Sequence, residues 1–167
     1  AVMDGTDAVM LSGESAAGDY PVEAVTTQAT IAKRGEDIYD YQKYLSGEYK
    51  TICKSVEKLV AYSVVSTADK IKEAKLIIAV TNSGATARTI SQLKPETPIL
   101  AITHSSQVLT SLALNFGVIA TQMPKVSTVD ELLDGAVERA KELGLVVAGD
   151  MVVISAGSIE GKGNTDL

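Results

Sequence analysis

The sequence contains no tryptophan, one cysteine and one histidine, and aromatic residues make up only 4% of the chain. A single cysteine, Cys53, excludes an internal disulfide and favours a reducing, cytoplasmic setting. With His104 as the sole histidine, a zinc site built from the usual nitrogen and sulfur ligands has too few donors. Because aromatic residues are scarce, the core must be aliphatic, as is usual for buried parallel sheets.

Two further absences each exclude a class of partner. No stretch approaches the ~20 apolar residues of a membrane span, and the start, Ala1–Asp4, lacks the basic end and long apolar centre of a signal peptide. The net charge of −6 argues against a nucleic-acid partner, which requires a basic face. What the chain does have is 46% hydrophobic residues, enough for the core of one domain, or of one domain and a piece of another.

The most informative stretch is 76–94, which predicts a strand, a small polar loop and a helix. Leu76–Val80 is an apolar run rich in β-branched residues, typical of a buried strand. Apolar residues at helical spacing follow the loop, and Pro95 ends the helix. The loop between them consists of Thr81, Asn82, Ser83, Gly84, Ala85 and Thr86.

This loop has the composition of an anion site, most often one for phosphate. Backbone N–H groups and the hydroxyls of Ser83 and Thr86 are expected to converge at the positive end of the helix dipole. Gly84 permits close approach of the backbone to a ligand. The alternative is that Ser83 or Thr86 only caps the helix.

The remaining elements are predicted from the same periodicities. A buried strand over Asp7–Leu11 and a helix from Pro21 to Arg34 form a β–α unit without a partner strand, so we expect this unit to belong to a domain mostly missing here. Residues 38–50 are predicted to be an irregular or helical connection. Further helices are predicted at 51–72, 108–114 and 129–143, and further strands at 98–102, 118–120 and 151–154.

The alternation of helix and strand after residue 51 predicts an α/β fold, a mostly parallel sheet of about four to five strands with helices on both faces. Ligands of such sheets bind outside the carboxyl ends of the strands. Three strand ends are expected there, at Thr81–Thr86, Thr103–Ser106 and Ser155–Gly163. The predicted sheet therefore supports the anion-site interpretation of the first of these loops.

The stretch Asp4–Pro21, DGTDAVMLSGESAAGDYP, resembles the last βα unit of the catalytic barrel of pyruvate kinases. The C-terminal domain of that family is matched, at similar spacing, by Thr81–Arg88, Pro98–Thr103, Ala156-Gly157, Gly161, Gly163 and Asn164-Thr165. The resemblance covers essentially the whole chain but only about the last third of a typical member. It implies that residues 1–34 are the leftover βα unit of a TIM barrel and that residues 35–167 form the C-terminal allosteric and subunit-contact domain.

Members of this family transfer a phosphoryl group from phosphoenolpyruvate to ADP with magnesium and usually potassium. The resemblance implies that the intact enzyme needs both ions, whereas this chain lacks the main catalytic lysine, metal carboxylates and substrate arginine. We therefore expect the chain alone to be inactive and to bind no metal or cofactor. Ser12 matches a serine at the barrel mouth that is proposed to help protonate the enolate. The implied partners are the chain's own catalytic barrel, further copies in a homo-oligomer, and a phosphorylated effector.

The effector site implied by the resemblance comes from two loops and comprises Thr81, Asn82, Ser83, Gly84, Ala85, Thr86, Arg88, Gly161, Lys162 and Gly163. Many members that sense sugar bisphosphates carry Lys or Arg where Asn82 and Ala85 stand here. This departure favours a monophosphate, or no physiological effector, over a bisphosphate.

Two other functions compete with this interpretation. A serine hydrolase built on Ser83, His104 and an aspartate such as Asp150 lacks the glycines of a nucleophile elbow, because Thr81 and Ala85 occupy those positions. A stand-alone sugar-phosphate-binding module accounts for everything after residue 51 but leaves residues 1–34 unexplained.

Overall fold

The computed structural model describes residues 1–52 and 55–157. Within these ranges it describes all side chains except those of residues 48–52. The chain divides into two compact units, residues 1–40 and residues 41–167. Each unit is described by itself.

The first unit is helical. It contains a short 3-10 helix, η1 (Val2–Asp4), one turn of helix, α1 (Gly13–Ala16), and the long helix α2 (Pro21–Asp37), which starts at a proline as predicted. The predicted strand at Asp7–Leu11 is wrong, because that segment adopts no regular structure. No strand occurs among residues 1–40, so the segment has no neighbour in its unit with which to form a hydrogen-bonded ladder.

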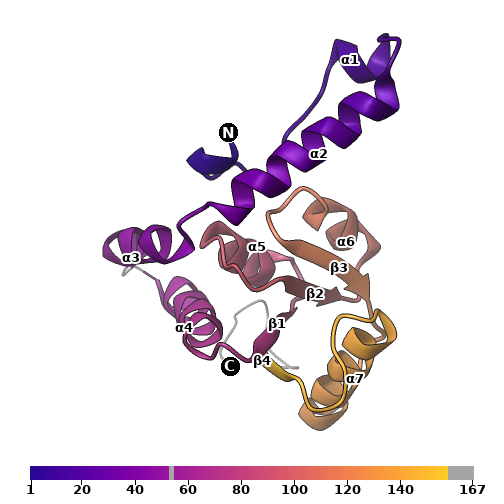
Figure 1. The fold of residues 1–167 in the computed structure, drawn as a ribbon. Helices are drawn as coiled ribbons and strands as arrows, with labels where there is room; N and C mark the ends of the chain where they lie inside the picture. The colour runs from indigo at the N-terminus through magenta and orange to yellow at the C-terminus, as the bar shows by residue number, and fades with distance from the viewer. Residues whose placement is uncertain (53–54, 158–167) are drawn as a thin grey trace. The chain divides into compact units, whose positions relative to one another are not determined.

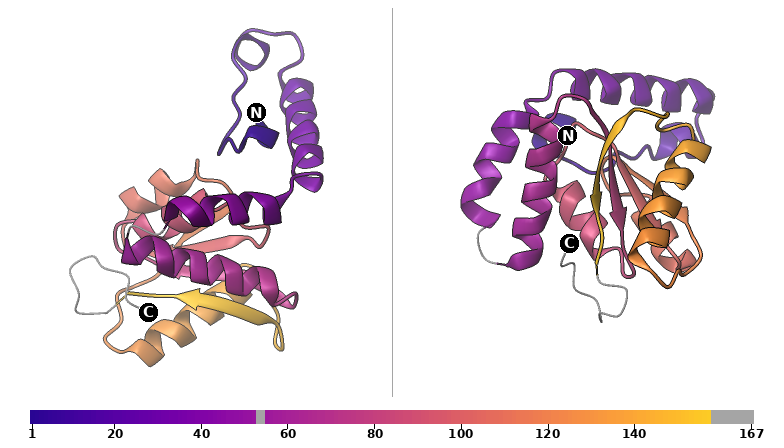
Figure 2. Two further views of the ribbon diagram at one scale, coloured as in Figure 1. Left: turned by 90° about the vertical axis from the view of Figure 1, so that its left-hand side faces the viewer. Right: turned by 90° about the horizontal axis from the view of Figure 1, so that it is seen from below.

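The second unit is built on a four-stranded sheet. Its strands are β1 (Ala74–Val80), β2 (Ile99–Thr103), β3 (Val118–Gln122) and β4 (Met151–Ser155). They lie in the order β3-β2-β1-β4, and each pair is parallel. The α/β class, the parallel sheet and the helices on both faces are therefore confirmed, as Figures 1 and 2 show.

Five helices accompany the sheet: α3 (Tyr41–Ile52), α4 (Val56–Lys70), α5 (Ala85–Gln92), α6 (Ser106–Leu112) and α7 (Val129–Glu142). The prediction of one continuous helix over 51–72 is wrong. Ser55 has an extended backbone, and its hydroxyl accepts a hydrogen bond from the Lys58 N–H at 3.3 Å, so it caps a new helix, α4. Most of the connection predicted at 38–50 is helical and belongs to α3, the helix before α4.

The two faces of the sheet carry separate cores. On one face α4, α5 and α6 cover Ile77, Ala79, Ile99 and Ala101. On the other face α7 contributes Ala136 and Ala140 to a cluster with Leu76, Ile78, Leu100 and Ile102. Figure 2 shows α7 on the opposite side of the sheet from α4. The edge strand β4 is therefore reached from the opposite face of the sheet to that covered by α4, α5 and α6.

Candidate functional site

The candidate site lies at the carboxyl end of β1, beside the edge strand β4. From β1 the chain passes to α5 on one face, whereas the neighbouring strand β4 is reached from α7 on the other face. Ala79 lies opposite Ser155 in the register, so the residues that follow both strands emerge side by side. Open α/β sheets bind ligands outside the carboxyl ends of the strands where the strand order reverses, which here is between β1 and β4.

The loop after β1 is a tight turn held by its own polar groups. Gly84 has φ 81°, a left-handed conformation that favours glycine. Its N–H donates to Thr81 Oγ1 at 2.9 Å, and the N–H of Ala85 makes a long contact of 3.4 Å with Ser83 Oγ. The loop therefore already uses two of the N–H groups that the sequence predicted to face a ligand, those of Gly84 and Ala85.

Helix α5 begins at a glycine N-cap, which itself has no side chain. Gly84 occupies the N-cap position, no side-chain cap hydrogen bond is formed, and the first turn carries no acidic residue. The N-cap position belongs to Gly84, and the hydroxyl of Ser83 accepts the long hydrogen bond from the Ala85 N–H. Asn82, Ser83 and Ala85 are exposed, Thr86 is half-buried, and Thr81 is buried beneath them.

Arg88 folds back from α5 onto this loop. Its Nη1 donates to the backbone carbonyl of Ser83 at 3.0 Å, and its Nη2 donates to Ser111 Oγ on α6 at 2.8 Å. An ideal Cβ placed on Gly84 would lie 3.1 Å from both guanidinium nitrogens. The structure thus brings Arg88 to the predicted loop. It also adds Ser111, which sequence analysis missed because its position on α6 carries no recognisable motif.

The second predicted strand end, Thr103–Ser106, is ordered by local bonds. Thr103 Oγ1 accepts from the Ser105 N–H at 3.2 Å, and Ser105 caps α6 through the Val108 N–H. The backbone carbonyl of His104 accepts a hydrogen bond from Gln122 Nε2 at 2.9 Å. Within the part of the chain that the structure describes, no hydrogen bond joins His104 to Ser83, so the geometry does not support a hydrolase pair. Gly161, Lys162 and Gly163 lie outside the described residues.

Ser12 belongs to the other unit, where it is exposed and precedes α1. Its N–H donates to Glu14 Oε2 at 3.2 Å. Hydrogen bonds from the backbone N–H groups of Glu14 and Ser12 lower the pKa of the Glu14 carboxyl below its ordinary value. Ser12 is thus accessible, and the polar group next to it in this unit is the Glu14 carboxylate.

The described residues contain neither a metal-binding cluster nor a membrane-spanning helix. Residues 1–52 and 55–157 contain no group of three or more His, Cys, Asp or Glu side chains arranged to hold a metal ion. None of the helices in these ranges has the length and apolar character needed to cross a membrane.

Comparison with protein families gives two matches. The family model of the pyruvate kinase alpha/beta domain matches residues 58–167, and that of the pyruvate kinase barrel domain matches residues 1–25. The two matches follow one another along the chain in the order that the sequence resemblance predicted.

Individual relatives agree with the family models. The chain is 44% identical over 167 residues to pyruvate kinase of Bacillus licheniformis, covering all of this chain and 28% of that protein. It is 42% identical over 157 residues to pyruvate kinase of Clostridium acetobutylicum, covering 94% of this chain and 33% of that protein. A crystal structure of a pyruvate kinase from Cryptosporidium parvum superposes with a TM-score of 0.87 at 33% identity, over 93% of this chain and 32% of that one.

The chain thus spans about a third or less of the length of the relatives that it matches. The alpha/beta family model alone covers more than half of the chain, and the fold of that region is the one seen in the solved relative. The chain therefore belongs to the pyruvate kinase family, of which it represents the C-terminal region.

Proposed function

We propose that this chain is the C-terminal region of a cytoplasmic enzyme that transfers a phosphoryl group from phosphoenolpyruvate to ADP, and that residues 41–167 bind a phosphorylated effector at the loop 81–86. The identity with pyruvate kinases supports the reaction. The match of residues 1–25 to the barrel family model argues against a stand-alone sugar-phosphate module, because such a module has no use for a barrel segment.

The observation that carries the effector proposal is an unneutralised positive region at the start of α5. The N-cap residue of this helix is Gly84, which has no side chain, and the first turn contains no acidic residue. The partners of Arg88 in the structure are a carbonyl and a hydroxyl, both uncharged. A helix N-terminus and a guanidinium on the same loop favour an anion in a chain whose net charge is −6.

Access to this region supports the same proposal. Asn82, Ser83 and Ala85 are exposed, so a ligand reaches the loop without moving the sheet. The 3.4 Å contact between the Ala85 N–H and Ser83 Oγ is long, and a phosphate oxygen is a stronger acceptor than a hydroxyl. The register between β1 and β4 puts Ala156, the residue that follows β4, beside the start of this loop.

The catalytic part of the proposal rests on residues outside this chain. Ser12 is proposed to lie at the barrel mouth near the substrate in the whole enzyme. The described residues offer no carboxylate cluster that fits magnesium, so we assign the implied magnesium and potassium to the whole enzyme and expect the chain alone to be inactive. We further propose that residues 41–167 mediate homo-oligomerisation.

Titration calorimetry of the chain with glucose 6-phosphate, ribose 5-phosphate and fructose 1,6-bisphosphate tests the effector site. We expect saturable binding of a monophosphate, weakened about tenfold or more in Arg88→Gln, the size of a lost hydrogen bond to a charged group. Thr86→Ala should weaken binding by roughly 1–2 kcal/mol. Arg34→Gln, which removes an exposed arginine of the other unit, is the charge-matched control and should bind like the unaltered chain.

Gly84 is not suitable for this test, because its φ is positive and an added Cβ would lie 3.0 Å from Val108 Cγ1. Substitutions there would destabilise the loop itself. The effector proposal fails if the unaltered chain shows no saturable binding of any of the three phosphates, or if Arg34→Gln weakens binding as much as Arg88→Gln does.

A further inference from the structure

A separate cavity lies at the opposite end of the strands from the loop 81–86. It has a volume of about 430 Å³ and is bordered by α3, α4, the start of β1 at Ala74 and the turn that leads into β2 at Pro98. Its volume is within the range of roughly 300–1,000 Å³ that is typical of small-molecule sites. Because it lies at the amino ends of the strands, it is separate from the candidate site at their carboxyl ends.

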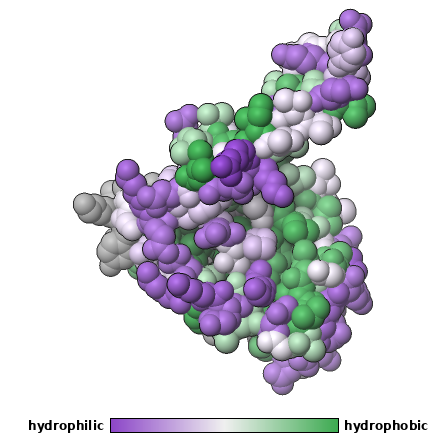
Figure 3. All heavy atoms as spheres, viewed as in Figure 1, coloured by the Kyte–Doolittle hydropathy of each residue, from purple (hydrophilic) through white to green (hydrophobic). Residues whose placement is uncertain are grey.

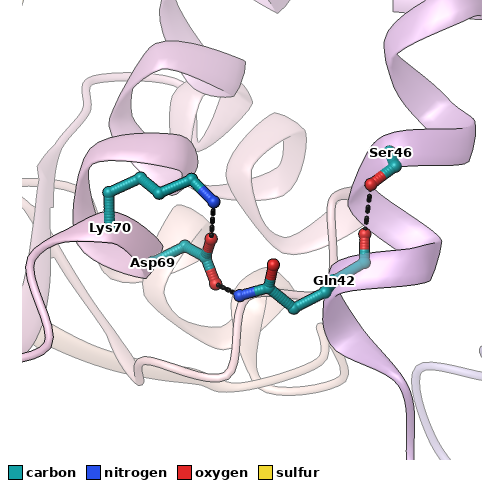
Figure 4. A network of polar contacts seen from close by, with 4 residues as sticks. All are labelled: Gln42, Ser46, Asp69 and Lys70. Carbon is teal, nitrogen blue, oxygen red and sulfur yellow. Dashed lines mark hydrogen bonds and ion pairs between the residues drawn. The ribbon is translucent and has the colours of Figure 1, made fainter.

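Hydrogen bonds between elements hold the walls of this cavity in place. Gln42 Nε2 on α3 donates to Asp69 Oδ1 on α4 at 2.6 Å, and the hydroxyl of Tyr44 donates to the carbonyl of Gln92 on α5 at 3.3 Å. Figure 4 shows Asp69 between Gln42 and Lys70, whose Nζ lies 3.6 Å from the second carboxylate oxygen. The helix α3 is therefore tied to two other helices, and the cavity is formed without a ligand.

The lining combines an apolar floor with a cationic rim. The buried apolar residues of the lining are Leu45, Val65, Ala68, Ala74 and Leu93. Lys72 and Lys75 are exposed, and neither forms an ion pair with a carboxylate in the described part of the chain. Asp69 is already paired, so Glu96 is the remaining lining carboxylate set against two lysines.

A third lysine, Lys94, forms part of the wall in an uncommon conformation. Its φ of 49° is the one positive φ of a non-glycine residue among the described residues, and only 4% of its surface is exposed. Its Nζ lies 4.7 Å from the centre of the Phe116 ring, and its N–H bonds the Ser91 carbonyl at the end of α5. Residues held in sparsely populated backbone conformations cluster at ligand sites, although a helix end also uses this conformation.

We propose that this cavity binds a small organic carboxylate with a flat apolar body, which lies on the aliphatic floor while the carboxylate faces Lys72 and Lys75. The floor accounts for the apolar part of the ligand, since it offers no charged group. Because the rim carries more lysines than free carboxylates, it favours a ligand with a negative charge. The proposal is independent of phosphate binding at the loop 81–86.

Benzoate and its neutral isostere benzamide are suitable probes, because they differ in charge but hardly in shape. Two-dimensional NMR of the full chain should show saturable shifts of Leu45, Ala68 and Leu93 with benzoate at low millimolar concentrations, and about five- to tenfold weaker binding of benzamide. The double variant Lys72→Gln/Lys75→Gln should bring benzoate affinity down to that of benzamide. Raising the salt concentration should weaken benzoate binding and leave benzamide binding unchanged.

The double variant Lys58→Gln/Lys125→Gln removes the same charge from exposed positions outside the cavity and is the matched control. It should bind benzoate like the unaltered chain. The proposal is overturned if benzoate causes no saturable shifts in the cavity, if benzamide binds as tightly as benzoate, or if the control variant loses as much affinity as Lys72→Gln/Lys75→Gln.

Discussion

The two units of this chain carry similar amphipathic helices, but only one of them buries its apolar side chains. In α4 of the second unit, Ala61, Val65 and Ala68 are at most 4% exposed. In α2 of the first unit, Val22 is 72% and Val25 is 50% exposed, although both helices follow the same periodicity. The comparison teaches that spacing is enough to specify a helix, whereas burial also requires a second surface of matching shape.

In the first unit, the apolar face of α2 is left uncovered. An apolar hollow of about 660 Å³ runs along α2 and is lined by Val9, Leu11 and Ile31 among others. Figure 3 shows hydrophobic residues among the hydrophilic ones on the surface of this unit. A barrel strand buries such side chains against neighbouring strands, and residues 1–40 contain no strand.

The largest contrast is expected in hydrogen exchange. Amides of Ile77–Val80 lie in the centre of the sheet and should exchange only on global unfolding, whereas those of Val9–Leu11 form no ladder. We expect protection factors at least about 1,000-fold higher in the strand. Equal protection of the two segments in a chain that sedimentation proves monomeric would contradict the comparison.

Truncating one isoleucine in each unit measures the same contrast as free energy of unfolding. Ile78 is fully buried between β2 and β4, and Ile78→Ala should destabilise the second unit by about 2–5 kcal/mol. Ile31 is 67% exposed, and Ile31→Ala should change stability by less than about 0.5 kcal/mol. Urea unfolding followed by circular dichroism provides both values, and similar losses would show that the first unit has a buried core after all.

Helix caps sharpen the comparison further. Thr128 and Glu131 form a reciprocal capping box at the start of α7, whereas Ser12 precedes α1 without a side-chain cap bond. Thr128→Ala should therefore cost about 1 kcal/mol, and Ser12→Ala less than about 0.5 kcal/mol, in the same urea experiment. A loss in Ser12→Ala as large as in Thr128→Ala would mean that Ser12 makes a stabilising contact that the structure does not contain.

The smallest expected effect is local to the first unit and depends on pH. Because the folded pKa of Glu14 is lowered, the stabilising N–H bonds are present above its ordinary pKa and are lost as pH falls through the folded value. The amide resonance of Ser12 should report this titration below the pKa of glutamate in an unfolded peptide. Glu14→Gln should abolish it, and a titration at or above the peptide value would contradict the assigned bonds.

Short-range patterns predicted much of the second unit correctly. All four strands were found from apolar runs rich in β-branched residues, and the turn through Gly84 lies where the sequence predicted it. The break between α3 and α4 was missed, because the apolar rhythm continues across Ser55 and hides the cap. The strand predicted at Asp7–Leu11 fails for the opposite reason, since its local pattern is right but its pairing partners are absent from the unit.

Contacts between distant segments were beyond the reach of the sequence. The hydrogen bond from Arg88 to Ser111 joins two helices. The wall of the cavity at the amino ends of the strands depends on the hydrogen bond between Gln42 and Asp69. Neither pair is linked by a periodicity or a motif, because each depends on how complete elements pack. The candidate site was therefore predicted as a loop but not as a set of side-chain partners.

The strand order has a consequence for how this region is made on the ribosome. β1 and β4 are neighbours, with Ile78 opposite Ile154, yet about 70 residues separate the end of one strand from the start of the other. At roughly 5–20 residues per second, the central strand waits several seconds after its synthesis for its second neighbour. During that interval one edge of an otherwise assembled sheet is open to pairing with other nascent chains. Translation speed over 81–150 thus sets how long this region remains vulnerable to aggregation.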